Sequence, residues 1–288
     1  MSNGIIQLRP IVVLRRLTFF LSAVVPSLKP RFQTAACRFL YWTISSGLKN
    51  EDSAFMNYGY ASLDSDATGL KLDPEDEADR FSIQLYRRVA GARDLRGKNV
   101  LEIGCGRGGG ASFVARYMHP AALTGVDLSA KGIRYCQRRH RIAHLTFLQG
   151  DAGNLPLPPS SFDAVVNVES SHCYPSFERF LGEVARVLRP SGFLLFADLR
   201  SREEVAPLRE QLKERFTIIE EEFMTANVVR ALELDSDRRN LLIQKRAPRF
   251  LHQGLQNFSG VSGSTVFDAF ASDKWQYVRF VLQKSPAS

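Results

Sequence analysis

The sequence predicts an α/β protein whose core is a parallel sheet with crossover helices. Residues 97–200 alternate short apolar segments, which have the length of strands, with amphipathic segments, which have the spacing of helices. A glycine-rich turn in "VLEIGCGRGGG" follows the first strand, where a bare backbone can approach a ligand closely. With 44% hydrophobic and 24% charged residues, the 288-residue chain has an ordinary globular composition and enough length for one large core.

Each predicted element follows from a local pattern. Apolar residues between 177 and 188 fall on one face of a helix, which Pro190 and Gly192 are expected to end. Two late strands are expected at 216–224 and 275–284. Helices are expected between them, because the intervening segment is too long for a hairpin. The five core strands are expected at 99–103, 121–126, 145–149, 162–168 and 192–198.

Four segments are expected along the chain. They are a basic apolar arm (1–50), a lid with a helix (51–95), a ligand-binding core (96–200) and a C-terminal cap of strands and helices (201–288). The arm contains seven Lys and Arg and no Asp or Glu, so the rest of the chain carries only one of the eight net positive charges. A nucleic-acid-binding body would spread its basic residues more widely, so nucleic acid is not an expected partner.

The arm has three possible interpretations. It can fold as helices that cap the core, lie in an anionic membrane interface through residues 5–45, or act as an organelle-targeting segment. Its apolar run from Leu17 to Val25 covers about half of what a bilayer span requires. The four cysteines lack the spacing of a metal site, so no metal is expected, and their usage favours a cytoplasmic location.

The glycine-rich turn and three acids predict a nucleoside ligand. Gly104 and Gly106 let the backbone approach the ligand, although the same spacing suits a nicotinamide-dependent oxidoreductase, which stays an alternative. Asp127 ends the second strand, where a carboxylate can accept both ribose hydroxyls. Asp151 closes the third strand and can meet an adenine amino group. Glu102 lies inside the first strand, where a positively charged ligand would compensate its carboxylate.

Ordered motifs narrow the choice of ligand. "VLEIGCGRGG", "GVDLS", "GDAGNLPLP" and "EVARVLRPSGFLLFADLR" resemble the motifs of class I S-adenosylmethionine-dependent methyltransferases. The resemblance implies a Rossmann-like seven-stranded sheet with the last strand antiparallel, helical cap elements, and S-adenosylmethionine as the cofactor. The cofactor contacts that it implies are Glu102, Gly104, Cys105, Gly106, Asp127, Leu128, Asp151, Ala152 and Asn167.

The segment "NVESSHCYPSF" leaves the fourth strand where a methyl acceptor would arrive. His172 is the candidate general base, because an imidazole titrates near neutral pH, and Glu169 is expected to orient it. Together with "GGGASFVARYMHPAALTGVDL" and "KGIRYCQRRHR", this segment resembles the phthiotriol/phenolphthiotriol dimycocerosates methyltransferases. That resemblance implies O-methylation of a hydroxyl on a hydrophobic lipid or polyketide-type natural product.

Two other functions stay open at this point. The enzyme can methylate a carbon of an isoprenoid or polyketide, with Glu169 stabilising a cation, or the protein can be a non-catalytic cofactor-binding subunit. The aromatic segment "FMNYGYA" precedes the core. It corresponds to a segment that closes over the cofactor in related methyltransferases, so Tyr58 and Tyr60 are further candidate cofactor contacts. The alternative is that these rings pack the first helix against the sheet.

Overall fold

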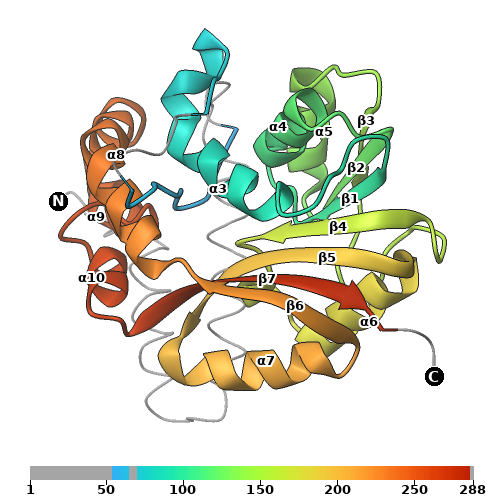
Figure 1. Cartoon of the computed structure of the whole chain (residues 1–288). Coiled ribbons are helices and arrows are strands. Elements are labelled where there is room, and N and C mark those ends of the chain that lie inside the picture. Colours follow the sequence, from blue (N-terminus) through green and yellow to red (C-terminus); the bar gives the residue numbers. More distant parts are fainter. Residues whose placement is uncertain (1–53, 65–69, 286–288) are drawn as a thin grey trace, which may run out of the picture.

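Seven strands form one sheet in the order β3-β2-β1-β4-β5-β7-β6 (Figure 1). The first five strands pair in parallel, and β7 lies antiparallel between β5 and β6. The expected seven-stranded α/β fold with an antiparallel last strand is therefore confirmed. The strands are β1 (Asn99–Ile103), β2 (Ala122–Asp127), β3 (Leu145–Gln149), β4 (Phe162–Val168), β5 (Leu188–Ser201), β6 (Phe216–Phe223) and β7 (Trp275–Lys284).

The structure is a computed structural model that describes residues 54–64 and 70–285. The expected basic arm, 1–50, and the membrane contact expected from residues 5–45 lie outside the described residues. Within the described part of the chain, no helix is both long and apolar enough to cross a membrane.

The start of β5 differs from the expectation. The strand begins at Leu188 instead of residue 192, and the preceding helix ends at Val187, so Leu188, which was expected on the helix, belongs to the strand. Leu188 pairs with Phe162, and the register then shifts before regular pairing resumes at Phe193. Pro190 lies in this irregular, exposed part of the strand. Proline is tolerated there because its missing N–H is not needed for a hydrogen bond between strands. A proline that ends a helix can therefore belong to the next strand.

Helices cover both faces of the sheet (Figure 1). One face carries α3 (Arg80–Ala90), α4 (Gly109–Tyr117) and α5 (Ala130–Arg139), and the other carries α6 (Phe177–Val187) and α7 (Val205–Lys213). Alternate strand residues feed the two cores, because successive side chains point to opposite faces. In β1, for example, the side chain of residue 100 packs with α3 and α4, and that of residue 101 packs with α6.

The helices expected between the two late strands are present. They are α8 (Thr225–Arg246), α9 (His252–Phe258) and α10 (Thr265–Ala271). The three helices lie together beside the end of β6 and the start of β7 (Figure 1). Asn227 of α8 pairs with the backbone of Ala61, since its side-chain amide donates to the Ala61 carbonyl at 2.9 Å and its own carbonyl accepts the Ala61 N–H at 3.1 Å. This helical cap thus holds the segment that precedes the core.

Short 3₁₀ helices join some of these elements. They are Pro74–Asp79, Ser171–Cys173, Arg202–Glu204 and Arg249–Leu251. The second of them directly follows β4 and carries the candidate base.

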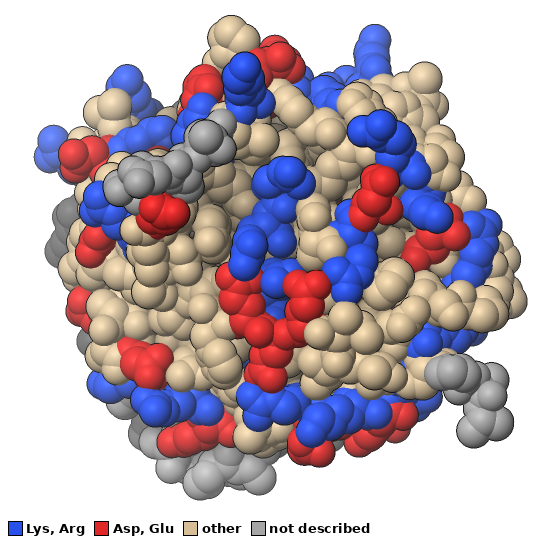
Figure 2. Space-filling model, viewed as in Figure 1, with Lys and Arg blue, Asp and Glu red and all other residues tan. Residues whose placement is uncertain are grey.

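Ion pairs reinforce the β6–β7 edge. Figure 2 shows acidic side chains in the middle of one face with Lys and Arg side chains around them. Arg279 of β7 contacts Glu220 at 2.9 Å and Glu222 at 2.7 Å, both on β6. Arg88 of α3 contacts Glu222 at 2.7 Å. These ion pairs connect α3 to the edge of the sheet and neutralise the negative charges of the β6 glutamates.

Replacing Phe180 with alanine tests the α6 side of the core. The ring is fully buried, so Phe180→Ala should lower the free energy of unfolding by about 3–5 kcal/mol through lost burial and a cavity. Phe223→Ala is the matched control, because that ring is 51% exposed, and it should cost less than about 1 kcal/mol. Guanidinium unfolding followed by circular dichroism measures both. Equal losses would contradict this account of the core.

Candidate active site

A cavity of about 400 Å³ lies at the carboxyl edge of the parallel strands, where open α/β sheets bind their ligands. Its wall combines residues 54–58 with the turns that follow β1, β2, β3 and β4. Residues 54–58 are part of the lid segment expected from the sequence, and we call them the lid from here on. The predicted site residues that line it are Tyr58, Gly104, Cys105, Gly106, Asp127, Leu128, Asp151, Ala152, Glu169 and His172. Tyr60, Glu102 and Asn167 do not line it.

The glycine turn after β1 is required by both conformation and space. Gly104, Gly106 and Gly108 have φ angles of 76°, 56° and 77°, in the left-handed region that favours glycine. A Cβ atom on Gly104 would lie 2.4 Å from the hydroxyl oxygen of Ser170. The bare backbone therefore lets the turn after β4 approach the turn after β1, and α4 begins directly behind it at Gly109.

Glu102 lies behind the cavity wall with one oxygen satisfied. The Tyr86 hydroxyl, which lines the cavity, donates to its Oε1 at 2.7 Å. Its Oε2 is buried without a well-formed hydrogen bond among the described residues, although the backbone N–H of Ala111 lies close enough to the carboxylate to oppose the effect of burial. Burial raises the pKa of Glu102 to about 7, since the charged form is poorly solvated there. A cationic group bound nearby would stabilise the ionised carboxylate.

Asn167 shapes the wall from behind. Its side-chain amide donates to the Ile103 carbonyl at 2.9 Å and to the Ser170 hydroxyl at 2.8 Å. The same amide is 3.0 Å from the hydroxyl of Tyr174, which lines the cavity with Ser170. Its Oδ1 has no partner within the described part of the chain. Asn167 is therefore close to the site, and its visible contacts hold the turn that follows β4.

Asp127 links the glycine turn to the end of β2. Its Oδ2 accepts the Gly106 N–H and its Oδ1 accepts the Ser129 N–H, both at 2.9 Å. Next to it, the side chain of Leu128 is 48% exposed and offers an apolar surface. Asp151 faces the same part of the cavity, and its Oδ1 accepts the Gly153 N–H at 2.8 Å. Carboxylates beside an apolar side chain suit a ribose and a purine ring.

The lid is held by hydrogen bonds from two sides. The N–H of Tyr58 donates to the two carboxylate oxygens of Glu169 at 2.9 and 3.2 Å. Arg239 of α8 donates to the Tyr58 carbonyl at 3.0 Å and pairs with Asp235 at 2.8 Å. Tyr60 lies just beyond the lid and does not line the cavity. Its N–H donates to the Phe81 carbonyl and its ring packs against the core, which agrees with the alternative of ring packing. Of the two predicted tyrosines, Tyr58 lines the cavity.

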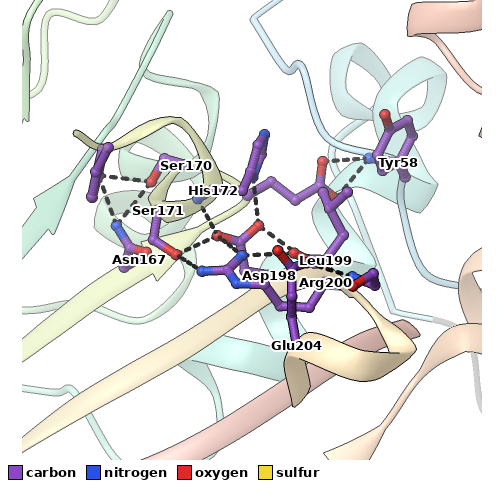
Figure 3. A network of polar contacts seen from close by, with 12 residues as sticks. Tyr58, Asn167, Ser170, Ser171, His172, Asp198, Leu199, Arg200 and Glu204 are labelled. Carbon is purple, nitrogen blue, oxygen red and sulfur yellow. Dashed lines mark hydrogen bonds and ion pairs between the residues drawn. The ribbon is translucent and has the colours of Figure 1, made fainter. Parts of the chain in front are cut away.

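His172 is paired with Asp198, a residue that the sequence interpretation missed (Figure 3). The imidazole Nδ1 lies 2.7 Å from Asp198 Oδ1, and the His172 backbone N–H donates to Oδ2 at 3.0 Å. An ionised carboxylate can only accept, so Nδ1 carries the proton and Nε2 is left as an acceptor. His172 lines the cavity, so this arrangement forms a base that can take a proton there.

The charge of Asp198 is stabilised although the side chain is completely buried in β5. Burial alone would raise its pKa, but the charge of the His172 ring when it is protonated, the charge of Arg200 and the hydrogen bonds from His172 and Ser171 lower it well below its usual range. The Arg200 Nη1 lies 3.1 Å from Asp198 Oδ2, and its Nη2 donates to the Ser171 hydroxyl at 2.6 Å (Figure 3). These contacts keep Asp198 ionised.

The expectation that Glu169 orients His172 is wrong, because Asp198 occupies that position. Glu169 instead accepts the backbone N–H of Tyr58 in the lid. It has a φ of 46°, which is rare for a residue with a side chain and typical of functional sites. Its enclosure raises its pKa to about 7, against the opposing effect of the Tyr58 hydrogen bond. Glu169 and His172 therefore face the same cavity with separate partners.

Comparison with known proteins identifies the family. The methyltransferase domain family matches residues 101–196. The chain is 44% identical over 224 residues to a fatty-acid O-methyltransferase of Mycolicibacterium smegmatis, covering 77% of this chain and 81% of the relative. It is 42% identical over 256 residues to the phthiotriol/phenolphthiotriol dimycocerosates methyltransferase of Mycobacterium tuberculosis, covering 86% and 91%.

Solved structures agree at the level of the fold. The O-methyltransferase StiE superposes with a TM-score of 0.61 at 21% identity, covering 83% of this chain and 90% of that chain. Geranyl diphosphate C-methyltransferase from Streptomyces coelicolor superposes with a TM-score of 0.59 at 16% identity, covering 84% and 96%. With the sequence relatives, they show that the chain belongs to the class I S-adenosylmethionine-dependent methyltransferases, in the group of the mycobacterial fatty-acid and phthiotriol/phenolphthiotriol dimycocerosates enzymes.

Proposed function

We propose that this enzyme methylates a hydroxyl group of a hydrophobic lipid or polyketide-type natural product. The His172–Asp198 pair carries the proposal, because a hydroxyl must lose its proton during transfer and this pair can take it within the cavity. The names of two relatives, for fatty acids and for phthiotriol dimycocerosates, support a lipid acceptor. Apolar residues of the lid and of α9, including Met56 and Phe258, line the cavity and support the same class.

The residues of the cavity fit S-adenosylmethionine. The buried Glu102 Oε2 lacks a well-formed hydrogen bond among the described residues, and the ammonium group of the cofactor would compensate this carboxylate. Asp127 would accept the ribose hydroxyls, Asp151 would meet the adenine amino group, and Leu128 would pack on the adenine ring. When bound, the cofactor supplies an electrophilic methyl group on a positively charged sulfur.

The chain's own residues would then prepare the acceptor. Asp198, held ionised by Arg200, keeps the proton of the His172 ring on Nδ1. Nε2 accepts the acceptor's hydroxyl proton as the oxygen becomes nucleophilic. Asp198 stabilises the resulting imidazolium. The lid, fixed by Glu169 and Arg239, covers the cavity and orients the acceptor.

Methylation at carbon is a second candidate, because Glu169 places a carboxylate in the same wall. Addition of a methyl group to an alkene would leave a carbocation, which becomes the methylated alkene by losing a proton. Such a carboxylate can stabilise the cation or take that proton. This reaction would depend on Glu169 and would not need the His172–Asp198 pair.

Product analysis separates the two candidates. The full-length protein is incubated with methyl-deuterated S-adenosylmethionine and long-chain secondary alcohols, phenolic lipids or isoprenoid alcohols. Mass spectrometric fragmentation then locates the label. We expect the label on the ether oxygen of a hydroxylated lipid. Label on a carbon atom, or none in any hydroxylated lipid, would contradict the proposed function.

Variants of the base pair should lose turnover and keep cofactor affinity. His172→Ala and Asp198→Asn should each lower kcat by about 10²–10⁴-fold, the usual contribution of a general base. Binding of S-adenosylhomocysteine, measured by calorimetry, should stay near the wild-type value. His119→Asn is the control, because His119 is exposed and its φ of 50° suits asparagine, and it should retain full activity. Unchanged kcat in His172→Ala would sink the assignment of the base.

Glu102→Gln should stabilise the protein at pH 8 and weaken its affinity for S-adenosylmethionine at the same pH. A folded-state pKa of about 7 against 4.5 for the free group means that ionised Glu102 destabilises the fold as pH rises from 4.5 to 7, and no further above that. Replacing it should add roughly 2–3 kcal/mol at pH 8 and little at pH 4.5. Thermal unfolding at both pH values measures the gain in stability, and calorimetric titration of the cofactor at pH 8 measures the loss of affinity.

Glu183→Gln gives a control of opposite sign. A hydrogen bond from Arg186 lowers the pKa of Glu183, so its charge stabilises the fold above pH 4.5 and this contribution is lost as pH falls. The variant should therefore be less stable than the wild type at pH 8. A loss of stability at pH 8 in Glu102→Gln as well would contradict the assignment of a raised pKa to Glu102.

A further inference from the structure

We propose that Glu169 selects neutral hydroxyl acceptors and excludes ionised carboxylates, such as those of fatty acids, from the acceptor end of the cavity. The inference rests on the proposed function and names the acceptor chemistry that the same site rejects. The relatives bear names of both kinds, one for fatty acids and one for phthiotriol.

The position of Glu169 lets its carboxylate meet the acceptor. The residue directly follows β4 with a φ of 46°, and its side chain lines the cavity that His172 also lines. Both carboxylate oxygens point at the N–H of Tyr58 in the lid, at 2.9 and 3.2 Å. The Tyr58 N–H and the Tyr277 hydroxyl stabilise the ionised form, but burial outweighs them and raises the pKa of Glu169 to about 7. The carboxylate can accept up to four hydrogen bonds, and neither of these two donors is a Lys or Arg side chain that would neutralise its charge.

The arginines near the site are engaged elsewhere. Among the described residues that line the cavity, one, Arg107, is a Lys or Arg. Its guanidinium lies 4.1 Å from the centre of the Tyr135 ring, beside the glycine turn. Arg200 contacts Asp198 and Ser171. Arg239 contacts Asp235 and the carbonyls of the lid. A carboxylate acceptor would therefore lose its hydration beside Glu169 without gaining a strong cationic partner.

The chemistry of the two acceptors points the same way. A fatty-acid carboxylate is already ionised at neutral pH and needs no base, so a site for it requires a cation and not a proton acceptor. A hydroxyl requires a base and is uncharged when it binds. The cavity wall contains His172, held by Asp198, which can take the proton of a hydroxyl acceptor. The same wall contains Glu169, whose negative charge repels a carboxylate acceptor.

The protonation of Glu169 gives the discrimination a pH signature. The titratable groups that interact with it are Tyr58 of the lid, Tyr86 of α3, Tyr277 of β7, Asp198 of β5 and His172. Its pKa of about 7 leaves the carboxyl neutral at pH 6 and ionised at pH 8. Repulsion of a carboxylate acceptor should therefore grow as pH rises through 7.

The test compares hexadecanol with hexadecanoic acid as acceptors for the full-length protein. We measure the ratio of kcat/KM for the acid to kcat/KM for the alcohol between pH 6 and 8.5, in wild type and Glu169→Gln. Glutamine keeps an oxygen that can accept the Tyr58 N–H and removes the charge. Wild type should prefer the alcohol, and its acid-to-alcohol ratio should fall by about tenfold between pH 6 and 8, as expected for the ionisation of one group. At pH 8 the ratio should be at least about tenfold higher in Glu169→Gln, with the pH trend removed.

Glu178→Gln serves as the matched control, because Glu178 is exposed on α6 and should leave both the ratio and its pH trend unchanged. Three results would overturn the inference: equal use of acid and alcohol by wild type, an unchanged ratio in Glu169→Gln, or persistence of the pH trend in that variant, which would assign the trend to another group. Methylation of neither acceptor by wild type that binds S-adenosylhomocysteine would overturn the proposed function and the inference with it.

Discussion

Carboxylates enclosed at the ends of parallel strands are the constraint on which this site depends. Glu102, Asp127 and Glu169 lie at or next to the ends of β1, β2 and β4, and Asp198 lies in the last third of β5. Each needs donors because an uncompensated charge away from water is costly. Asp127 takes an N–H of the glycine turn, Glu169 takes an N–H of the lid, and Asp198 takes the imidazole of His172. The hydrogen bonds that compensate these acids therefore also hold the glycine turn, the lid and the base in place around the cavity.

Most of the sheet could be predicted from the sequence, because each core strand is an apolar run bounded by turn residues. The start of β5 could not, since Pro190 ends the α6 pattern and also suits an exposed, irregular part of a strand. The glycine turn alone left a nicotinamide cofactor open. Glu102 and the ordered motifs pointed to S-adenosylmethionine, and membership of the methyltransferase family excludes the oxidoreductase.

The partners of the catalytic candidates could not be predicted from local sequence. Asp198 carries a signal, because it closes an apolar run as Asp127 does, but its contact with His172 depends on β4 and β5 being neighbours in the sheet. Glu169 is three residues from His172 and was the nearer choice along the chain. Its unusual backbone angle turns the carboxylate toward the lid, and no residue pattern reports that angle.

The place of β7 in the sheet has a consequence for biosynthesis. It separates β5 from β6, and Asp198 lies in register with Val278 of this strand. Because β7 follows both β5 and β6 in the chain, β5 lacks this neighbour beside Asp198 until β7 has been synthesised and has left the ribosome. The surroundings of Asp198, and with them the base pair, are therefore complete only after β7 has inserted between two strands that precede it in the chain.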